Sequence, residues 1–260
     1  MGILNVTPDS FSDGGKYSNV NTALEHARQM ISEGADVIDI GGESTRPGAE
    51  PVSTGEELDR VMPVVERLRA ESECCISIDT STPEVIHAVV GHADLINDVR
   101  ALTRDGALAA AATTRLPVCV MHMQGQPESM QDNPTYDDLM ITLKDFFDER
   151  IAACISHGIP RDQLLLDPGF GFGKTPEHNL MLINRLGELL AFDLPLLVGL
   201  SRKSTIGRLC GDDTVVGSVI GAMVAIAKGA RVVRVHDVRQ TRVALNVVQA
   251  IDGEQLVVSN

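Results

Sequence analysis

The apolar residues of this chain recur in a fixed order: a short apolar run, a cluster of charged or amide side chains, then a stretch with helical spacing. The order repeats eight times. The runs are rich in Val, Ile and Leu, which is typical of strands covered on both faces. They read GILN, DVIDIGGESTR, CISIDT, DLIND, PVCVMHM, LLLDPGFGFGK, LLVGLSRKS and VVRVHD. Their polar ends fall at Asn5, Thr45/Arg46, Asp79, Asn97, His122, Asp167, Lys203 and Arg234/His236.

Helical segments are predicted after these runs, and several begin after a Ser, Thr, Asp or Asn that is suited to an N-cap. They span Asn21–Glu33, Thr54–Ser72, Pro83–His92, Gly106–Thr114, Tyr136–His157, Pro176–Leu190, Gly217–Lys228 and Arg239–Ala250. Eight strand–helix units predict an α/β fold of the (β/α)8 TIM-barrel type, as a single domain over residues 1–260. A doubly wound open sheet is the alternative. Polar endings on all eight runs favour the closed barrel, because its chemistry sits at the carboxyl ends of the strands.

Composition narrows the possible functions. The chain has 260 residues, 43% of them hydrophobic, and a net charge of −14. This acidic balance argues against nucleic-acid and anionic-membrane partners, which require basic surfaces. The sequence shows no signal peptide and no apolar run of the roughly 20 residues that span a membrane. The five cysteines lack metal-site spacing. We therefore expect a cytoplasmic protein with reduced thiols.

Two loops after the first and second strands are long and rich in Gly, Pro and Ser. They span Thr7–Ser18 and Gly41–Thr54. Loops of this kind at the carboxyl face of a barrel commonly move and bind substrate. Ordinary connectors are the alternative, but the many polar side chains favour binding.

Four strand ends supply two carboxylates, an amide and an amine to one barrel mouth: Asp79, Asn97, Asp167 and Lys203. Carboxylates accept hydrogen bonds from ring N–H and NH2 groups, whereas Lys and Asn donate to ring oxygen or nitrogen. The set predicts a site for a flat heterocycle with alternating donors and acceptors. A buried ion pair between Asp167 and Lys203, with a purely structural role, is the alternative.

A second polar group comes from the first and last strands. Arg234 and His236 are two residues apart and therefore share a face of the last strand. Arg offers a bidentate fork to phosphate, and the neutral oxygen of Asn5 suits Mg2+. These residues predict an anion and metal corner, with a satisfied core histidine as the alternative for His236. The Gly169–Lys174 segment is not a P-loop, and we expect its glycines to let Phe170 and Phe172 project beside a ring.

The motifs GILNVTPDSFSDGG, IDIGGESTRPGA, SIDT, LINDV, MHMQG, LLDPGFGFGK, GLSRKS and RVHDV follow one another in the order seen in a known family. Over essentially its whole length the chain resembles bacterial dihydropteroate synthases. The resemblance implies a homodimeric barrel transferase of folate biosynthesis. Its reaction condenses 7,8-dihydropterin-6-ylmethyl diphosphate with 4-aminobenzoate to 7,8-dihydropteroate and pyrophosphate, and sulfonamides inhibit it.

The resemblance also implies residue roles. The pterin site comprises Asp79, Asn97, Asp167 and Lys203; the aminobenzoate site comprises Thr45, Arg46, Pro47, Phe172, Lys203 and Ser204. Asn5, Arg234 and His236 bind the diphosphate, with Mg2+ on Asn5, and the catalytic group is Asp79, Lys203, Arg234 and His236. In the first loop Phe11 is a candidate cover for the second substrate, and Asp9 and Asp13 are both candidates for an acid near the metal.

The implied mechanism is dissociative: diphosphate leaves first, and Asp79 stabilises a cation on the exocyclic methylene. Two other functions remain open, a pterin-dependent methyltransferase and a catalytically silent pterin-binding barrel. Family members normally carry a short segment before the first strand. Here Met1 directly precedes Gly2, a departure that bears on stability and solubility and leaves the catalytic set unchanged.

Overall fold

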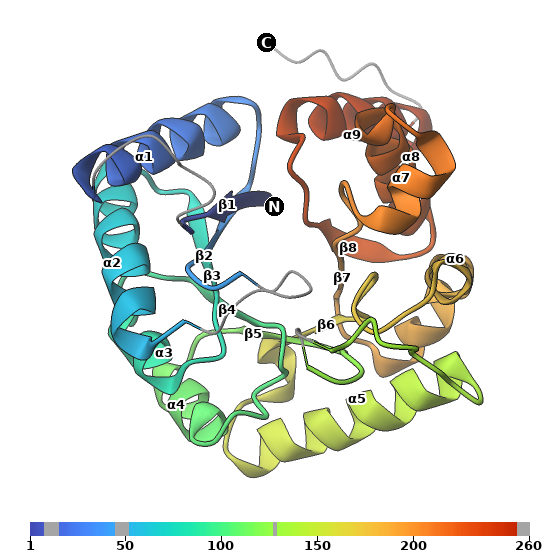
Figure 1. The fold of residues 1–260 in the computed structure, drawn as a ribbon, viewed down its shortest axis with the longest axis horizontal. Helices are drawn as coiled ribbons and strands as arrows, with labels where there is room; N and C mark the ends of the chain where they lie inside the picture. Colours follow the sequence, from blue (N-terminus) through green and yellow to red (C-terminus); the bar gives the residue numbers. More distant parts are fainter. Residues whose placement is uncertain (8–15, 45–51, 127–128, 254–260) are drawn as a thin grey trace.

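Eight parallel strands form one sheet whose strand order follows the sequence, in a computed structural model that describes residues 1–7, 16–44, 52–126 and 129–253. Figure 1 shows the sheet curled at the centre of the molecule. The strands are β1 (Gly2–Asn5), β2 (Val37–Gly41), β3 (Cys75–Asp79), β4 (Leu95–Asp98), β5 (Val118–Met121), β6 (Leu164–Asp167), β7 (Leu196–Val198) and β8 (Ala230–Val233). The predicted α/β barrel is confirmed.

The last strand returns to the first. The Ile3 N–H donates to the carbonyl of Val235 at 3.0 Å, and the Val235 N–H donates to the carbonyl of Met1 at 2.9 Å. A parallel bridge pairs Gly2 with Val235. These bonds join the segment after β8 to β1, which the open-sheet alternative would not require.

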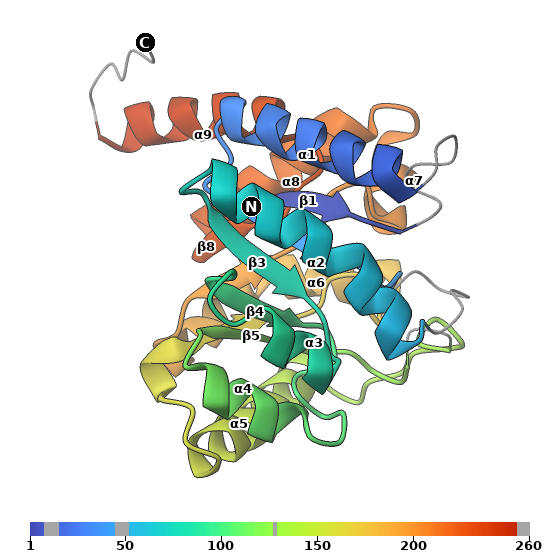
Figure 2. The same cartoon turned by 90° about the vertical axis from the view of Figure 1, so that its left-hand side faces the viewer.

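Helices surround the strands, as Figures 1 and 2 show. They are α1 (Lys16–Ser32), α2 (Thr54–Glu71), α3 (Pro83–Ala88), α4 (Ala107–Thr114), α5 (Leu139–Ser156), α6 (Pro176–Asn184), α7 (Ser204–Cys210), α8 (Thr214–Ala227) and α9 (Val238–Asp252), with 3-10 turns η2 (Arg161–Gln163) and η3 (Leu186–Phe192). No single helix in the described ranges has the length and apolar character of a membrane span. Helices α7 and α8 reach that length and apolar character only when taken together, and the chain bends by 113° between them.

The predicted helices differ from the structure most at three places, while the other predicted helix ends are within four residues of the observed ones. Helix α1 begins at Lys16, inside the segment predicted as a loop. The predicted Pro176–Leu190 helix ends at Asn184 and continues as the separate turn η3. Helix α7 was not predicted, because its seven residues are too few to show a helical period. It ends at Gly211, whose positive φ of 57° stops the helix.

The core between sheet and helices is filled mainly by aliphatic side chains, and α5 adds the fully buried ring of Phe147. This ring packs edge-on against Phe146 and Phe192, with centroid distances of 5.4 and 5.9 Å. Phe147 therefore fixes α5 against the core through contacts that a smaller side chain cannot make.

We expect Phe147→Ala to lower the free energy of unfolding by about 3–5 kcal/mol, because it removes buried area and leaves a cavity. Urea denaturation followed by circular dichroism measures this. Ile141 on the same helix is 58% exposed, so Ile141→Ala serves as the control and should change stability by less than about 0.5 kcal/mol. Equal losses in both variants would contradict this account of the core.

Candidate active site

Strand register brings three polar strand ends, on β1, β3 and β4, to one edge of the barrel. Asn5 pairs with Gly41, Gly41 with Asp79, and Asp79 with Asn97. Because side chains two residues apart share a face of a strand, Asp39 lies on the same face as Gly41. The pairing therefore gathers residues from β1 to β4 into one inward-facing row.

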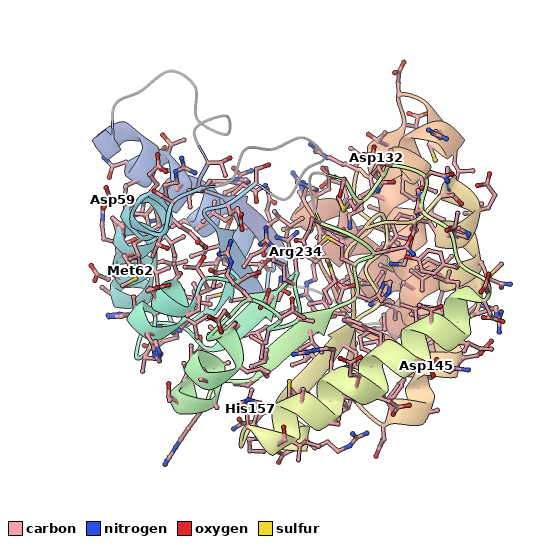
Figure 3. The ribbon with its side chains drawn as sticks, turned by 60° about the horizontal axis from the view of Figure 1, so that its bottom comes forward. Asp59, Met62, Asp132, Asp145, His157 and Arg234 are labelled. Atoms are coloured by element: carbon pink, nitrogen blue, oxygen red, sulfur yellow. The ribbon has the colours of Figure 1, made fainter. Side chains whose placement is uncertain are left out.

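Arg234 follows β8 and crosses the barrel to reach this row; Figure 3 shows it near the centre of the molecule. Its Nε donates to Asp39 Oδ2 at 2.5 Å, and its Nη2 donates to Asp79 Oδ2 at 2.9 Å. Asp39 Oδ2 also accepts from Asn97 Nδ2 at 3.1 Å. One guanidinium thus orients two carboxylates, and Asp39 links it to an amide of the predicted heterocycle site.

Burial dominates the electrostatics of this network. It raises the pKa of Asp79 to about 7, although Arg234 acts in the opposite direction. Burial also acts to lower the pKa of Arg234, but Asp39 and Asp79 outweigh it, so that pKa is raised. Arg234 is therefore permanently charged, while Asp79 changes its protonation near neutral pH.

Asp167 and Lys203 face each other across the opposite side of the mouth. Burial raises the pKa of Asp167, and Lys203 and the Gly169 N–H, which donates to Asp167 Oδ1 at 2.8 Å, partly offset it. Burial lowers the pKa of Lys203 to about 8. Its Nζ donates to the Phe170 carbonyl at 2.5 Å and lies 4.3 Å from the centroid of the Phe172 ring.

The structural alternative for Asp167 and Lys203 is not observed. Among the described residues no ion pair joins Asp167 to Lys203; Arg234 pairs with Asp39 and Asp79, Arg100 with Glu43, and Arg202 with Asp237. The Lys203 amine instead binds a backbone carbonyl that a ligand could replace. The geometry favours a binding site over a structural pair.

The two phenylalanines of the glycine-rich segment have different surroundings. Phe172 is half-buried under Lys203, as predicted. The prediction that Phe170 also projects beside a ring is wrong, because this side chain is 2% exposed and belongs to the core. Alternation along a loop does not fix side-chain direction as it does along a strand.

The segment after β8 lies beside β1. His236 Nδ1 and Ser201 Oγ share a hydrogen bond of 3.1 Å, and the backbone N–H of His236 donates to the same oxygen at 3.2 Å. Val235, between Arg234 and His236, is bridged to Gly2, and β1 ends at the half-buried Asn5. The structure therefore places the two segments that carry the predicted anion corner side by side. Ser204 is exposed at the start of α7, directly after Lys203.

Comparison with known proteins gives consistent matches. The profile of the pterin-binding enzyme family matches residues 1–236. Dihydropteroate synthase of Escherichia coli strain K12 is 55% identical over 255 residues, covering 96% of this chain and 90% of that protein. The enzyme of the same name from Haemophilus influenzae is 49% identical over 255 residues, covering 96% and 92%.

Solved structures agree. A crystal structure of Yersinia pestis dihydropteroate synthase with a sulfonamide drug has a TM-score of 0.93 and 55% identity, covering 97% of this chain and 94% of that chain. Dihydropteroate synthase from Xanthomonas albilineans in complex with 7,8-dihydropteroate has a TM-score of 0.87 and 46% identity, covering 97% and 92%. The chain belongs to the dihydropteroate synthase family.

Several residues that the family resemblance assigns lie outside the described residues of this dihydropteroate synthase family member. They are Thr45, Arg46 and Pro47 of the second loop, and Asp9, Phe11 and Asp13 of the first. Their roles stay predictions. The structure describes only the ends of the two loops. These are Thr7 and the backbone from Lys16 in the first loop, and Gly41–Ser44 and Val52–Thr54 in the second.

Sequence reasoning missed Asp39 and Lys174 in this family member. Asp39 is fully buried in the middle of the apolar run VIDIG. A carboxylate inside a strand is costly unless it is paired, and that signal could have identified it. Lys174 is 2% exposed, and nothing in the glycine-rich segment around it predicts that its amine is buried.

The described part of the site offers few protein ligands for Mg2+. Among the described residues, no group of three or more His, Cys, Asp or Glu side chains comes together to hold a metal. Mg2+ commonly binds one or two protein oxygens and takes its other ligands from water and substrate phosphates. The single amide oxygen of Asn5, at a half-buried strand end beside the Arg234–His236 segment, fits this mode.

Proposed function

We propose that this protein is a dihydropteroate synthase, a transferase of folate biosynthesis. It joins 7,8-dihydropterin-6-ylmethyl diphosphate to 4-aminobenzoate, giving 7,8-dihydropteroate and pyrophosphate. The observation that carries the proposal is the set of buried groups around one barrel mouth: the Asp39–Arg234–Asp79 network with Asn97 on one side, and Asp167 with Lys203 on the other.

The pterin ring would occupy the space between these two groups. Asp79 and Asp167 accept from ring N–H and NH2 groups, and Asn97 and Lys203 donate to ring oxygen or nitrogen. Lys203 already donates to the Phe170 carbonyl, so it would exchange one acceptor for another. A site built around such buried polar groups rejects ligands that cannot pair them.

Charge placement suits departure of the diphosphate before the amine attacks. Arg234 and His236 lie at the end of β8 and would bind the leaving group, while the Asp79 carboxylate would stabilise positive charge on the pterin side. Arg234 keeps Asp79 oriented for this role through Nη2. The aromatic amine is neutral at pH 7 and already nucleophilic, so no strong general base is required.

Magnesium is part of the proposal. Asn5 would hold Mg2+, which would supply charge stabilisation for the diphosphate when bound. The protein's own contribution is one neutral oxygen and the neighbouring cation Arg234. Cofactor use remains a prediction that chelation can test.

The direct test is pyrophosphate release from the dihydropterin diphosphate. We expect release that needs 4-aminobenzoate, is abolished by EDTA and restored by excess Mg2+, and is inhibited by a sulfonamide competitively with 4-aminobenzoate. Lys203→Ala should lower kcat/KM by about 100-fold or more, because it removes a donor in a desolvated site. Pterin binding without release would support the silent barrel. Methyl transfer from a methylated pterin to a corrinoid acceptor would support the methyltransferase.

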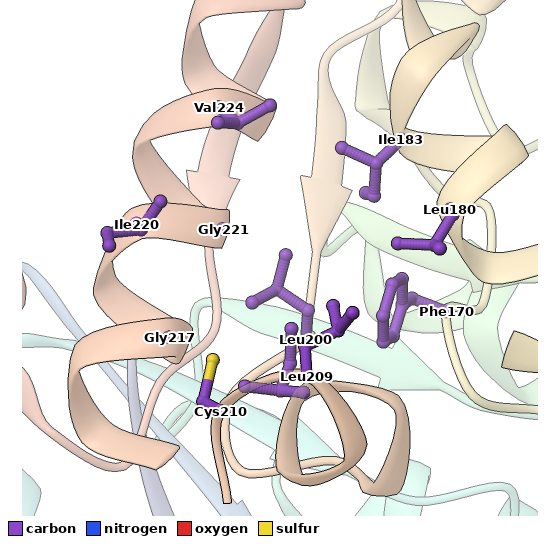
Figure 4. A pocket seen from close by; sticks show the side chains of 11 residues that line it. Phe170, Leu180, Ile183, Leu200, Leu209, Cys210, Gly217, Ile220, Gly221 and Val224 are labelled. Atoms are coloured by element: carbon purple, nitrogen blue, oxygen red, sulfur yellow. The ribbon is translucent and has the colours of Figure 1, made fainter. Parts of the chain in front are cut away.

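We also propose that the protein is a homodimer, as the family resemblance predicts. Apolar side chains of α6, α7 and α8 surround a pocket of about 250 Å3, shown in Figure 4. Four of them are exposed: Leu180 (47%), Leu209 (60%), Ile220 (59%) and Val224 (42%). A contiguous apolar surface of this kind is typical of a protein–protein interface.

Light scattering tests the dimer. We expect twice the chain mass of 27.9 kDa for the unaltered protein, and the monomer mass for Ile220→Asp, because a buried unpaired carboxylate in an apolar interface is costly. Ile141 is equally exposed on α5, so Ile141→Asp should leave the dimer intact. A monomeric unaltered protein at micromolar concentration would contradict the proposal. The cytoplasmic location stays a prediction.

A further inference from the structure

The segment that leaves β6 contains the buried amine of Lys174, for which the proposed reaction gives no role. Its Nζ donates to His122 Nδ1 at 2.9 Å and to the carbonyl of Phe172 at 3.0 Å. His122, at the end of β5, is itself 4% exposed. The imidazole therefore accepts at Nδ1, and its ring packs edge-on against Phe146 with centroids 4.9 Å apart.

Side chains hold the backbone of this segment at every residue from Phe170 to Gly173. The carbonyl acceptors and their donors are Phe170 with Lys203 Nζ (2.5 Å), Gly171 with Gln131 Nε2 (2.7 Å), Phe172 with Lys174 Nζ (3.0 Å) and Gly173 with Tyr136 Oη (2.6 Å). A loop held in this way presents its side chains in fixed directions, as a binding wall requires.

The same segment lies directly on the end of β5. A Cβ atom added to Gly169 would come within 1.8 Å of the His122 carbonyl oxygen, and one added to Gly173 within 2.5 Å of the Gln124 carbonyl oxygen. This close approach leaves the Lys174 amine enclosed between the two segments. Burial lowers the pKa of Lys174 to about 7, and Asp167 opposes that effect.

Lys174 and Lys203 bind alternate backbone carbonyls, those of Phe172 and Phe170. Lys203 Nζ lies 4.3 Å from the centroid of the Phe172 ring, while Lys174 holds the carbonyl of the same residue. Loss of the Lys174 bond would release Phe172 at its backbone but leave the Lys203 contact with the Phe170 carbonyl. The two amines can therefore be separated by substitution.

We propose that Lys174, held by His122, is a positioning residue for the second substrate: it fixes the Phe172 ring through the Phe172 carbonyl. The proposal rests on the proposed function, in which Phe172 lines the aminobenzoate site. It predicts that Lys174 governs the use of 4-aminobenzoate more than that of the pterin.

Steady-state kinetics of Lys174→Met test this, because Met keeps the length of the side chain and removes its donors. We expect the KM for 4-aminobenzoate to rise about tenfold, with kcat and the KM for the pterin diphosphate within about threefold of the unaltered enzyme. Lys144→Met is the matched control, since it makes the same change at a part-exposed lysine of α5 that pairs with Glu188 at 2.7 Å. It should leave the KM for 4-aminobenzoate within about twofold.

A double-mutant cycle separates positioning from general loosening. Phe172→Ala should also raise the KM for 4-aminobenzoate, and adding Lys174→Met should then raise it no further, because residues that act as a unit are non-additive. His122→Phe keeps a ring beside Phe146 and removes the acceptor; it should raise the same KM, and it provides the test if Lys174→Met does not fold.

Three results would overturn the proposal: an unchanged KM in both the Lys174 and His122 variants, an equal rise in Lys144→Met, or additive effects in the double variant. Failure of the proposed function gives a different result, because the unaltered protein would then release no pyrophosphate from the two substrates.

Discussion

Arg234→Lys should lower kcat/KM for pyrophosphate release by about 100- to 1000-fold while the barrel stays folded. The guanidinium bridges Asp39 and Asp79 with two different nitrogens, at 2.5 and 2.9 Å. A lysine ammonium is a point charge and cannot reproduce that fork. One carboxylate would lose its partner, and Asp79 would lose its orientation toward the pterin.

Arg242→Lys is the matched control. Arg242 Nε donates to the Gly34 carbonyl at 2.9 Å, and its Nη2 pairs with Asp36 at 2.5 Å, in the region where α1 leads into β2. The same chemical change there should leave kcat/KM within about twofold. Comparable losses in the two variants, or full activity of Arg234→Lys, would remove the central role that we assign to the Arg234 fork.

Asp79→Asn should lower kcat/KM by about 1000-fold and abolish a pH dependence of pterin binding that the unaltered protein shows. Burial raises the pKa of Asp79 to about 7. The ionised carboxylate accepts from a ring N–H more strongly than the protonated acid does, so affinity should be highest between this pKa and that of Lys203, which is about 8. Below pH 7 it should fall by up to about tenfold per pH unit.

Isothermal titration with a non-reactive pterin between pH 5.5 and 8.5, about 1.5 units on each side of the Asp79 pKa, measures this. Asp94, at the amino end of β4, accepts from the Ile76 N–H at 2.8 Å. Asp94→Asn should therefore retain the dependence of the unaltered protein. Affinity that is flat across this range, or that improves on acidification, would contradict the assignment.

Much of the barrel could be predicted from local pattern. Short apolar runs with polar ends predicted all eight strands, because a strand covered on both faces needs a continuous apolar sequence. The site residues Asp79, Asn97, Asp167 and Lys203 stood out for the same reason, since each ended or followed such a run. Family resemblance then supplied roles that no pattern carries.

Other features depended on contacts that local pattern does not contain. Helix α7 was too short for a period, and Phe170 turned into the core where a loop pattern placed it beside the ligand. Asp39 was hidden inside an apolar strand, although its cost of burial was a readable signal. The exposed apolar face of α6 to α8 emerged only when these three helices packed side by side.

By itself the sequence determined the strand–helix order, the barrel and the four polar strand ends that we propose to bind a heterocycle, because strand burial and helix periodicity are encoded locally. Only the tertiary structure decided which charges meet. Arg234 binds Asp39, 195 positions away, and Lys174 binds His122, 52 positions away. Such pairs depend on strand register and barrel closure, which place residues from β2, β3, β5 and β8 around one mouth. Burial in that mouth then shifts the pKa values of these residues.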